Sequence, residues 1–219
     1  IEALWVHPKK LAELLSLHRR PRWIVRVHSK AAFLAMEGIA MEWINAYNNL
    51  DDIYGNLKVS CNHEAFNNEL NHITNLKSIY LPNIYNPMHR EFFHYKPDDG
   101  IRPINIGCFG AIRPLKNQFQ QIIAACMFAK REGRILNIHV NGTRQEQNGD
   151  NVLRNIRGLI SNTQHTLVEH DWYSHSEFLT CLVPEMDMGM QVSFTESFNI
   201  VTADFVHAGV PIVVSNDVE

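Results

Sequence analysis

The sequence lacks the features that mark several large classes of protein. Its 219 residues include only four cysteines, Cys61, Cys108, Cys126 and Cys181, and no two of them form a CxxC pair. Because each lies in an apolar segment, we expect reduced thiols in the core and a cytoplasmic protein rather than a disulfide scaffold. No apolar run approaches the ~20 residues of a membrane-spanning helix, so we expect at most peripheral contact with a membrane.

Long blocks of one charge and metal-binding motifs are also missing. The formal net charge is −3 and no basic block occurs, which argues against a nucleic-acid partner. Twelve histidines are present, but none of them lies in an HExxH motif. His165, His170 and His175 are spaced five apart, which does not place them on one face of a helix. We therefore predict no metal site.

The second half of the chain alternates short apolar runs with amphipathic segments. Hydrophobic residues make up 45% of the sequence, which is enough for a sizeable core. Short connections join the segments, a pattern typical of a parallel sheet with helices on both faces. Gly133 and Gly209 are predicted to end two helices, and Ser174 with Glu177 forms a capping box. The predicted strands are 104–109, 135–140, 166–169, 186–192 and 211–215, and the predicted helices are 116–133, 151–160, 174–183 and 198–209.

The first half repeats this alternation less regularly. The segment after residue 81 carries four prolines and no periodicity, which is typical of a linker between domains. We expect a partial N-terminal Rossmann-like domain over 1–85, a linker over 86–102 and a C-terminal Rossmann-like domain over 103–219. Since the chain begins and ends next to predicted strands, we expect both domains to be truncated. Strands are predicted at 2–6, 23–28, 57–61 and 78–81, and helices near 8–19, 33–48 and 63–75.

Four loops at the carboxyl ends of the predicted C-terminal strands are candidate ligand sites, because open parallel sheets bind ligands at that edge. They span 110–117, 141–145, 169–175 and 193–199, and the first two contain Gly110 and Gly142. Arg113 and Lys116 lie at a helix start, where an anion such as phosphate is favoured. The alternative is a solvated pair of surface cations. No Walker A or GxGxxG motif is present.

The turn at 193–199 leads into a predicted helix that carries an unusual acid. Backbone amides near Ser197, Phe198 and Asn199 are expected to be available to an anion at the helix start. Glu196 is read either as a sugar ligand or as an acid favoured by the helix dipole. Asp204 shares a helical face with apolar residues, where a carboxylate needs hydrogen-bond donors. Those donors are either a pair of sugar hydroxyls or the backbone of another loop.

The segment 104–217 resembles the donor-binding domain of GT-B glycosyltransferases, most closely the retaining family 4 type. That family carries the motif S-x-x-E-x-F-G-x-x-x-x-E-A-x-A-x-G-x-P-V-V, and this chain reads SFTESFNIVTADFVHAGVPIVV. The family's E-x7-E becomes Glu196 and Asp204. More loosely, the strand ending at His28 and the stretch SIYLPNIYNP resemble the N-terminal acceptor domain and its exit into the linker.

The resemblance implies a metal-independent glycosyltransferase that retains anomeric configuration. Its donor substrate would be a UDP-, GDP- or ADP-sugar, with no covalently bound cofactor, and its acceptor a saccharide or a lipid-linked molecule. His28 would contact the transferred sugar or the acceptor, or else make a structural hydrogen bond. Trp172 and Tyr173 lie where the family places the base, as stacking partners or as core aromatics. The diphosphate would be held by Arg113, Lys116 and the amides near Ser197, Phe198 and Asn199, the sugar by Glu196 and the ribose by Asp204. Gly110 and Gly142 would also belong to the donor site.

Departures from the family's motifs support a rival reading. Ala111 stands where the family has arginine, Asn117 and Asn199 stand where it has glycine, and Asp204 is one methylene shorter than glutamate. Ala111, Asn199 and Asp204 favour a nucleotide-sugar-binding or scaffolding domain without turnover. A second rival is an epimerase that hydrolyses its donor, although the acids and histidines of such a site are not identifiable. A dehydrogenase is disfavoured because neither domain has a dinucleotide motif.

Overall fold

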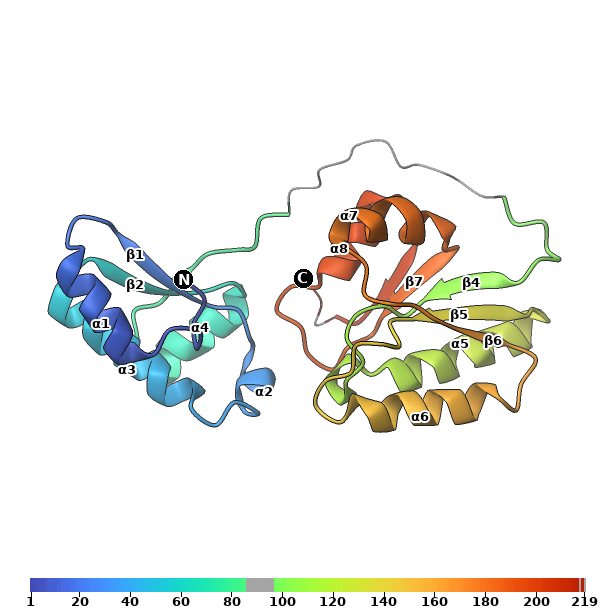
Figure 1. Cartoon of the computed structure of the whole chain (residues 1–219), viewed down its shortest axis with the longest axis horizontal. Coiled ribbons are helices and arrows are strands. Elements are labelled where there is room, and N and C mark those ends of the chain that lie inside the picture. The colour runs from blue at the N-terminus through green and yellow to red at the C-terminus, as the bar shows by residue number, and fades with distance from the viewer. Residues whose placement is uncertain (86–96, 217, 219) are drawn as a thin grey trace. The chain divides into compact units, whose positions relative to one another are not determined.

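The computed structural model describes residues 1–85, 97–216 and 218, and these form two compact α/β units (Figure 1). The first unit contains Ile1–Ile84 together with Thr195–Phe198. The second contains the described residues of Tyr85–Phe194 and Asn199–Val218. Part of the predicted linker, residues 86–96, lies outside the described residues. Each unit has a parallel sheet flanked by helices, which confirms the predicted fold class.

The first unit is built on a three-stranded sheet of order β1-β2-β3, in which every pairing is parallel. Its core consists of apolar side chains from the strands and the helices, among them Leu11, Val25, Ile44 and Val59. The strands are β1 (Trp23–Val27), β2 (Leu57–Cys61) and β3 (Ile79–Tyr80), and the helices are α1 (Pro8–Leu17), α2 (Ala31–Leu34), α3 (Ala40–Tyr54) and α4 (Glu64–Ile73).

Two predictions for this unit are wrong. Residues 2–6 form no strand, because Glu2 makes only a single bridge to Arg26 and Leu4 has a φ of 67°. The long helix lies at α3 and not at 33–48. It ends at Gly55, whose φ of 68° gives the left-handed cap that ends many helices. The predicted start of the helix at 33 belongs to the separate short helix α2.

The second unit has a five-stranded parallel sheet of order β6-β5-β4-β7-β8. The five predicted strands are confirmed; β6 has the predicted bounds and the other four are slightly shorter than expected. In Figure 1, α5 and α6 cover one face of this sheet, and α7 and α8 lie over the other. The elements are β4 (Ile104–Gly107), η1 (Pro114–Lys116), α5 (Gln118–Glu132), β5 (Leu136–Val140), α6 (Gly149–Ile160), β6 (Thr166–Glu169), α7 (His175–Glu177), η2 (Phe178–Leu182), η3 (Val183–Glu185), β7 (Met188–Gln191), α8 (Ile200–His207) and β8 (Ile212–Val214).

Helix starts differ from the predicted ones where local turns intervene. The capping box of Ser174 and Glu177 is confirmed, but its helix changes after one turn to a π-helix and then to a 3-10 turn. A 3-10 turn and Asn117, with a φ of 58°, precede α5. Asparagine is among the few non-glycine residues that tolerate this left-handed region, so the substitution at the family's glycine position is accommodated.

Two glycines on neighbouring strands position α8. Gly107 of β4 pairs with Gly189 of β7, and both lie against the ring of Phe205, which is fully buried. A Cβ atom built on Gly189 would lie 2.7 Å from that ring. The missing side chains therefore let the ring sit directly on the sheet, and this fixes the height of α8 above the strands.

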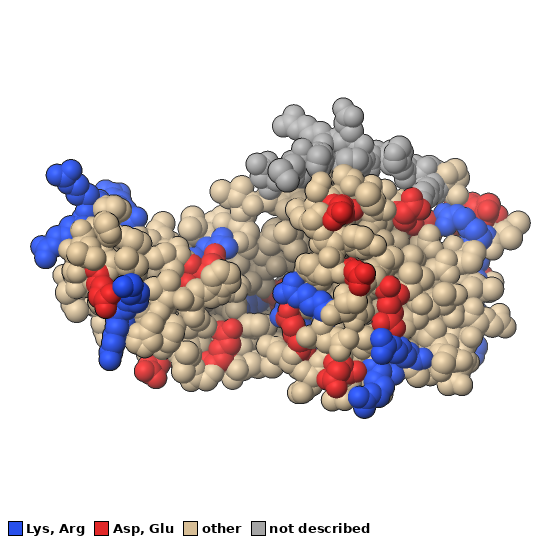
Figure 2. Space-filling model, viewed as in Figure 1, with Lys and Arg blue, Asp and Glu red and all other residues tan. Residues whose placement is uncertain are grey.

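The cysteines, the apolar helices and the surface charges can also be compared with the predictions from composition. All four cysteines are free, and Cys61 and Cys108 are buried as predicted, but Cys181 is exposed and does not belong to the core. No helix within the described ranges has the length and apolar character to cross a membrane. Charged side chains of both signs are scattered over the face of the molecule in Figure 2, with Lys and Arg gathered beside the turn between α1 and β1.

Candidate functional site

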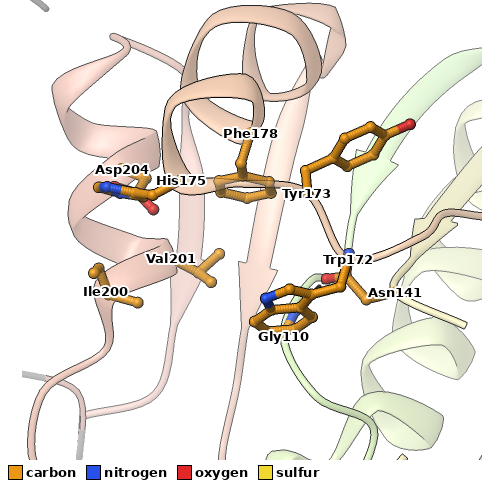
Figure 3. Close-up of a pocket in the computed structure, with 9 residues that line it drawn as sticks. All are labelled: Gly110, Asn141, Trp172, Tyr173, His175, Phe178, Ile200, Val201 and Asp204. Carbon is orange, nitrogen blue, oxygen red and sulfur yellow. Dashed lines mark hydrogen bonds and ion pairs between the residues drawn. The ribbon is translucent and has the colours of Figure 1, made fainter. Parts of the chain in front are cut away.

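A pocket opens in the second unit, at the carboxyl ends of its strands. Its volume is about 190 Å³. Figure 3 shows the residues that line it, which come from the loops after β4, β5 and β6, from the α7 region and from α8. The lining residues are Gly110, Asn141, Trp172, Tyr173, His175, Phe178, Ile200, Val201 and Asp204.

Gly110 and Asn141 form the floor on the β4–β5 side. The φ of Gly110 is 103°, a conformation that residues with a side chain rarely adopt. Its N–H donates to the Oδ1 atom of Asn141 at 2.8 Å. The buried Asn141 side chain also donates to the carbonyl of Asp171 at 3.3 Å. One asparagine thus ties together the loops that follow three neighbouring strands.

Asp204 projects from the middle of α8 and is almost fully buried, at 1% exposure. Its Oδ1 atom accepts a hydrogen bond from the Tyr85 hydroxyl at 2.6 Å and lies 2.8 Å from Nε2 of His175. Burial raises the pKa of the Asp204 carboxyl, although Tyr85, His175 and His207 all favour its charged form. Burial and the nearby carboxylate together raise the pKa of Tyr85. The Asp204 carboxylate is therefore bonded to side chains from two segments that are distant in the sequence. The sequence had predicted sugar hydroxyls or the backbone of a loop as its donors.

Asn199 caps the start of α8 and accepts a hydrogen bond from one of its N-terminal amide groups. Asn199 is the N-cap, and its Oδ1 accepts from the Thr202 N–H at 3.0 Å. Its Nδ2 donates to Gln191 at 2.9 Å, and Gln191 in turn donates to the Phe109 carbonyl at 2.8 Å. The helix thus begins at Ile200 and not at 198, with an ordinary φ of −102° at Asn199. A glycine is not required here.

Aromatic side chains form one wall of the pocket. Trp172 is half exposed, and the guanidinium carbon of Arg144 lies 4.1 Å from the centre of its ring system. In Figure 3 the indole lies beside Gly110, Phe178 lies between it and Asp204, and the Tyr173 ring points away from Asp204. Trp172 and Tyr173 are both exposed, so neither is the core aromatic that the sequence left open as an alternative.

The two predicted cations occupy different environments. Arg113 lies 3.3 Å from Glu146, which also pairs with Arg144 at 2.8 Å. A phosphate would have to compete with that carboxylate for Arg113. Lys116 ends the 3-10 turn, and its Cε atom lies 3.9 Å from where a Cβ atom on Gly110 would be. Lys116 is therefore the predicted cation closer to the pocket floor.

Gly142 does not line the pocket. A Cβ atom at this position would lie 2.3 Å from the carboxylate of Glu169. Glu169 makes two 2.7 Å hydrogen bonds with Arg157. The observed role of Gly142 is to give this ion pair room beside the loop.

A stacked histidine pair supports the loop that carries the aromatic residues. His139 and His170 stack at 14°, with Nδ1 of one 2.8 Å from Nε2 of the other. Within the described part of the chain, Nε2 of His139 is buried without a hydrogen-bond partner. Burial and the neighbouring His170 lower the pKa of His139 to about 4, although Asp187 opposes this. Burial also lowers the pKa of His170.

From the lowered pKa of His139 we predict that acid destabilises the folded protein. An unfolded histidine takes up a proton near pH 6.5, whereas His139 in the folded protein, with a pKa of about 4, takes it up only at lower pH. Because the unfolded chain then binds more protons, the free energy of unfolding should fall as pH falls through that window. His139→Phe keeps a stacking ring and should flatten the pH dependence of the urea midpoint. The exposed His72→Phe should leave it unchanged, and equal slopes in both variants and the parent would contradict the prediction.

The first unit has its own pocket around His28, at the carboxyl end of β1. The Nδ1 atom of His28 lies 3.2 Å from Glu2, which also pairs with Arg26 at 2.9 Å. Ser197 donates to the His28 carbonyl and accepts from Asn62 at 3.3 Å. The lining residues are Glu2, Trp5, Arg26, His28, Asn62, Asn83, Ser197 and Phe198.

The predicted site residues are therefore divided. Gly110, Trp172, Tyr173 and Asp204 meet in the pocket of the second unit, whose α8 is capped by Asn199. Glu196, Ser197 and Phe198 belong to the first unit, as does His28. Sequence reasoning missed Asn141, His175, Phe178, Ile200 and Val201. Asn141 and His175 lie in two of the loops that the sequence marked as candidate ligand sites, although neither residue was singled out.

No protein-family model matches the sequence, and neither does any curated protein. Solved structures do share its fold. The UDP-forming α,α-trehalose-phosphate synthase from Burkholderia xenovorans aligns over 99% of this chain and 58% of its own, with 14% identity and a TM-score of 0.63. Staphylococcus aureus TarM, in complex with fondaparinux, α-GlcNAc-glycerol and UDP, aligns over 94% and 39%, with 13% identity and a TM-score of 0.65.

A third structure, the N-terminal domain of Candida albicans trehalose-6-phosphate phosphatase, aligns over 94% of this chain and 54% of its own. Its identity is 10% and its TM-score 0.60. This chain thus spans between 39% and 58% of these neighbours. The likeness shows the GT-B fold, which confirms the fold predicted from the motifs.

Proposed function

We propose that the chain belongs to a glycosyltransferase that binds a nucleotide-diphosphate sugar in the pocket of the second unit. The observation that carries this proposal is the combination of a buried carboxylate, Asp204, with an exposed aromatic surface at Trp172 in one pocket. A nucleoside presents a flat ring and a pair of hydroxyls, which are the groups that such a pocket can hold. TarM, with the same fold, contains UDP in its structure.

In this proposal, different pocket residues bind the base, the ribose and the diphosphate of the donor. The base stacks on Trp172, where Arg144 lies against the indole. Asp204 accepts hydrogen bonds from the ribose hydroxyls, and His175 helps to hold its carboxylate in place. Lys116 and the N-terminal amides of α8 bind the diphosphate and stabilise the charge that develops as the sugar leaves. No metal ion is needed in this scheme, and UDP, GDP and ADP are the candidate nucleotides.

The first unit supplies the acceptor side of the proposal. His28 lies in a pocket with Glu2, Arg26 and two asparagines, which suits a hydroxyl-rich saccharide or lipid-linked acceptor. Glu2 orients the His28 ring through Nδ1. Glu196 is assigned to the hydroxyls of the donor sugar, as the motif implies. Anomeric retention, also implied by the motif, completes the proposed reaction.

A domain that binds nucleotide sugars without turnover is the second candidate. The same fold occurs in the N-terminal domain of Candida albicans trehalose-6-phosphate phosphatase, so the fold alone does not specify transfer. A thermal-shift panel of UDP, GDP, ADP and their sugars tests binding. Product analysis with simple saccharide acceptors then separates the two candidates. Stabilisation without release of nucleotide from the donor would favour the binding domain, and stabilisation by none of the panel would reject both.

Lys116→Ala tests the diphosphate assignment. Removing one cation from a charged hydrogen bond costs about 1.5–3 kcal/mol, so the affinity for nucleoside diphosphate should fall roughly 10- to 150-fold. The affinity for the nucleoside alone should be unchanged. Lys130→Ala removes an exposed lysine from the end of α5 and serves as the matched control. Isothermal titration calorimetry on both variants measures the difference, and equal affinity for the diphosphate would remove Lys116 from the site.

A further inference from the structure

An exposed cluster of arginines lies at the edge of the first unit opposite its candidate pocket. Arg19, Arg20 and Arg22 lie in the turn between α1 and β1, and all three are exposed. Among the described residues none of their guanidinium groups has an acidic partner. Figure 2 shows this concentration of Lys and Arg at the end of the first unit where the turn lies. We call these three residues the arginine turn.

The arginine turn is held in one conformation. The Asn56 side chain donates to the carbonyls of Arg19 at 3.1 Å and of Pro21 at 3.0 Å. The Trp23 indole N–H donates to the His18 carbonyl at 3.3 Å, and the Trp23 backbone N–H donates to the Asn56 carbonyl at 2.8 Å. These bonds engage the backbone and leave the three charged side chains in solvent.

Large apolar side chains accompany the charges. Leu17, the last residue of α1, is 75% exposed, and Ile53, in the last turn of α3, is 71% exposed. Both helices lead into strands of one parallel sheet, so their ends lie at its amino-terminal edge. Asn56, just beyond Ile53, is bonded to the arginine turn. Exposed leucine and isoleucine beside unpaired guanidinium groups are typical of surfaces that enter an anionic lipid interface.

We propose that the arginine turn, with Leu17 and Ile53, docks the first unit on a membrane leaflet rich in anionic phospholipid. The three guanidinium groups face the lipid phosphates, and the two apolar side chains enter the boundary between headgroups and acyl chains. A nucleic acid would use the cations but gain little from exposed aliphatic side chains, so the lipid surface is the better match. A single arginine would suffice to complement the negative end of α1, which leaves the other two unexplained by local helix electrostatics.

Docking at this edge leaves the pocket around His28 accessible to solvent and to an acceptor. The pocket lies at the carboxyl end of β1 and the arginine turn at its amino end, about 17 Å apart for a five-residue strand. The surface can therefore be changed without touching the proposed donor or acceptor residues.

Sedimentation with vesicles tests the proposal. The unmodified chain should bind vesicles of phosphatidylcholine mixed with phosphatidylglycerol, bind pure phosphatidylcholine much less, and lose binding as salt is raised. Each arginine near an anionic surface contributes about five-fold in partitioning, so the triple variant R19Q/R20Q/R22Q should lose roughly 100-fold. Leu17→Ser should weaken binding to the same vesicles with the charge unchanged.

A variant of equal charge loss provides the control. Lys130→Gln, Arg131→Gln and Arg154→Gln together remove three cations from the exposed faces of α5 and α6. This control should bind the anionic vesicles as the unmodified chain does. Thermal melts should show that both triple variants are folded. Equal loss in the two triple variants, or retention of a DNA oligonucleotide in place of vesicles, would overturn the proposal.

Discussion

Gly189→Ala is expected to destabilise the second unit and to weaken nucleotide binding at the same time. The new methyl group would lie 2.7 Å from the Phe205 ring and 3.0 Å from Ile212, both packed in the same core cluster. Overpacking of this kind typically costs about 1–3 kcal/mol, because the neighbours must leave their preferred rotamers. The ring can only move away from the sheet, and it would carry α8 and Asp204 with it.

The matched control for this change lies in α6. Gly158→Ala places a methyl group in open space, and alanine in a helix interior is favoured over glycine by about 0.5–1 kcal/mol. The urea midpoint should therefore fall for Gly189→Ala and rise slightly for Gly158→Ala. Only the first variant should lose affinity for a nucleoside diphosphate. An unchanged urea midpoint in Gly189→Ala would contradict the prediction, because it would show that the packing around Phe205 accommodates the added methyl group.

Asp204→Asn is expected to weaken donor binding strongly. The buried carboxylate is proposed to accept hydrogen bonds from the ribose hydroxyls, and an amide supplies one acceptor in place of two. Charged hydrogen bonds of this type are worth about 1.5–3 kcal/mol, so affinity for the nucleoside should fall at least ~10-fold. Asp150→Asn makes the same change at an exposed position of α6 and should have no effect.

The pH dependence of binding provides a second measure of this assignment. Burial raises the pKa of Asp204, while Tyr85, His175 and His207 oppose the rise. Below that raised pKa the carboxyl is protonated, so affinity should decline at a higher pH than an ordinary aspartate would give. Asp204→Asn should remove this decline. If the parent and the variant bind the nucleoside equally at every pH, Asp204 serves only as an anchor for Tyr85 and His175.

Stability should respond to Asp204 in the opposite sense to His139. An acid whose pKa is raised on folding binds more protons in the native state than in the unfolded state, for which the reference value is 3.8. Its contribution therefore decreases as pH rises from 3.8 through the raised pKa. The His139 contribution decreases as pH falls, between 6.5 and about 4. Single variants are needed to separate the two effects.

Most of the fold was predictable because it depends on local patterns. Alternating apolar runs marked the five strands of the second unit, and Gly133 marked the end of α5. The predictions were wrong where the sequence pattern was weak or fitted more than one local structure. Residues 2–6 have strand-like composition but form only one bridge, and a short helix, α2, precedes the long one. The turn before α5 was missed because Asn117 takes a backbone conformation usually associated with glycine.

The sequence by itself determined the α/β architecture, the capping box and the motif around Asp204, since periodicity and neighbouring residues specify these features. Only the tertiary structure decided which side chains pair with the charged groups of the site. Asp204 meets Tyr85 and His175 across 119 and 29 positions, and Arg113 meets Glu146 across 33. Which carboxylate faces which donor depends on how α8 sits on Gly107 and Gly189 and on where the loops end. Such contacts arise from packing in three dimensions and have no periodic trace along the chain.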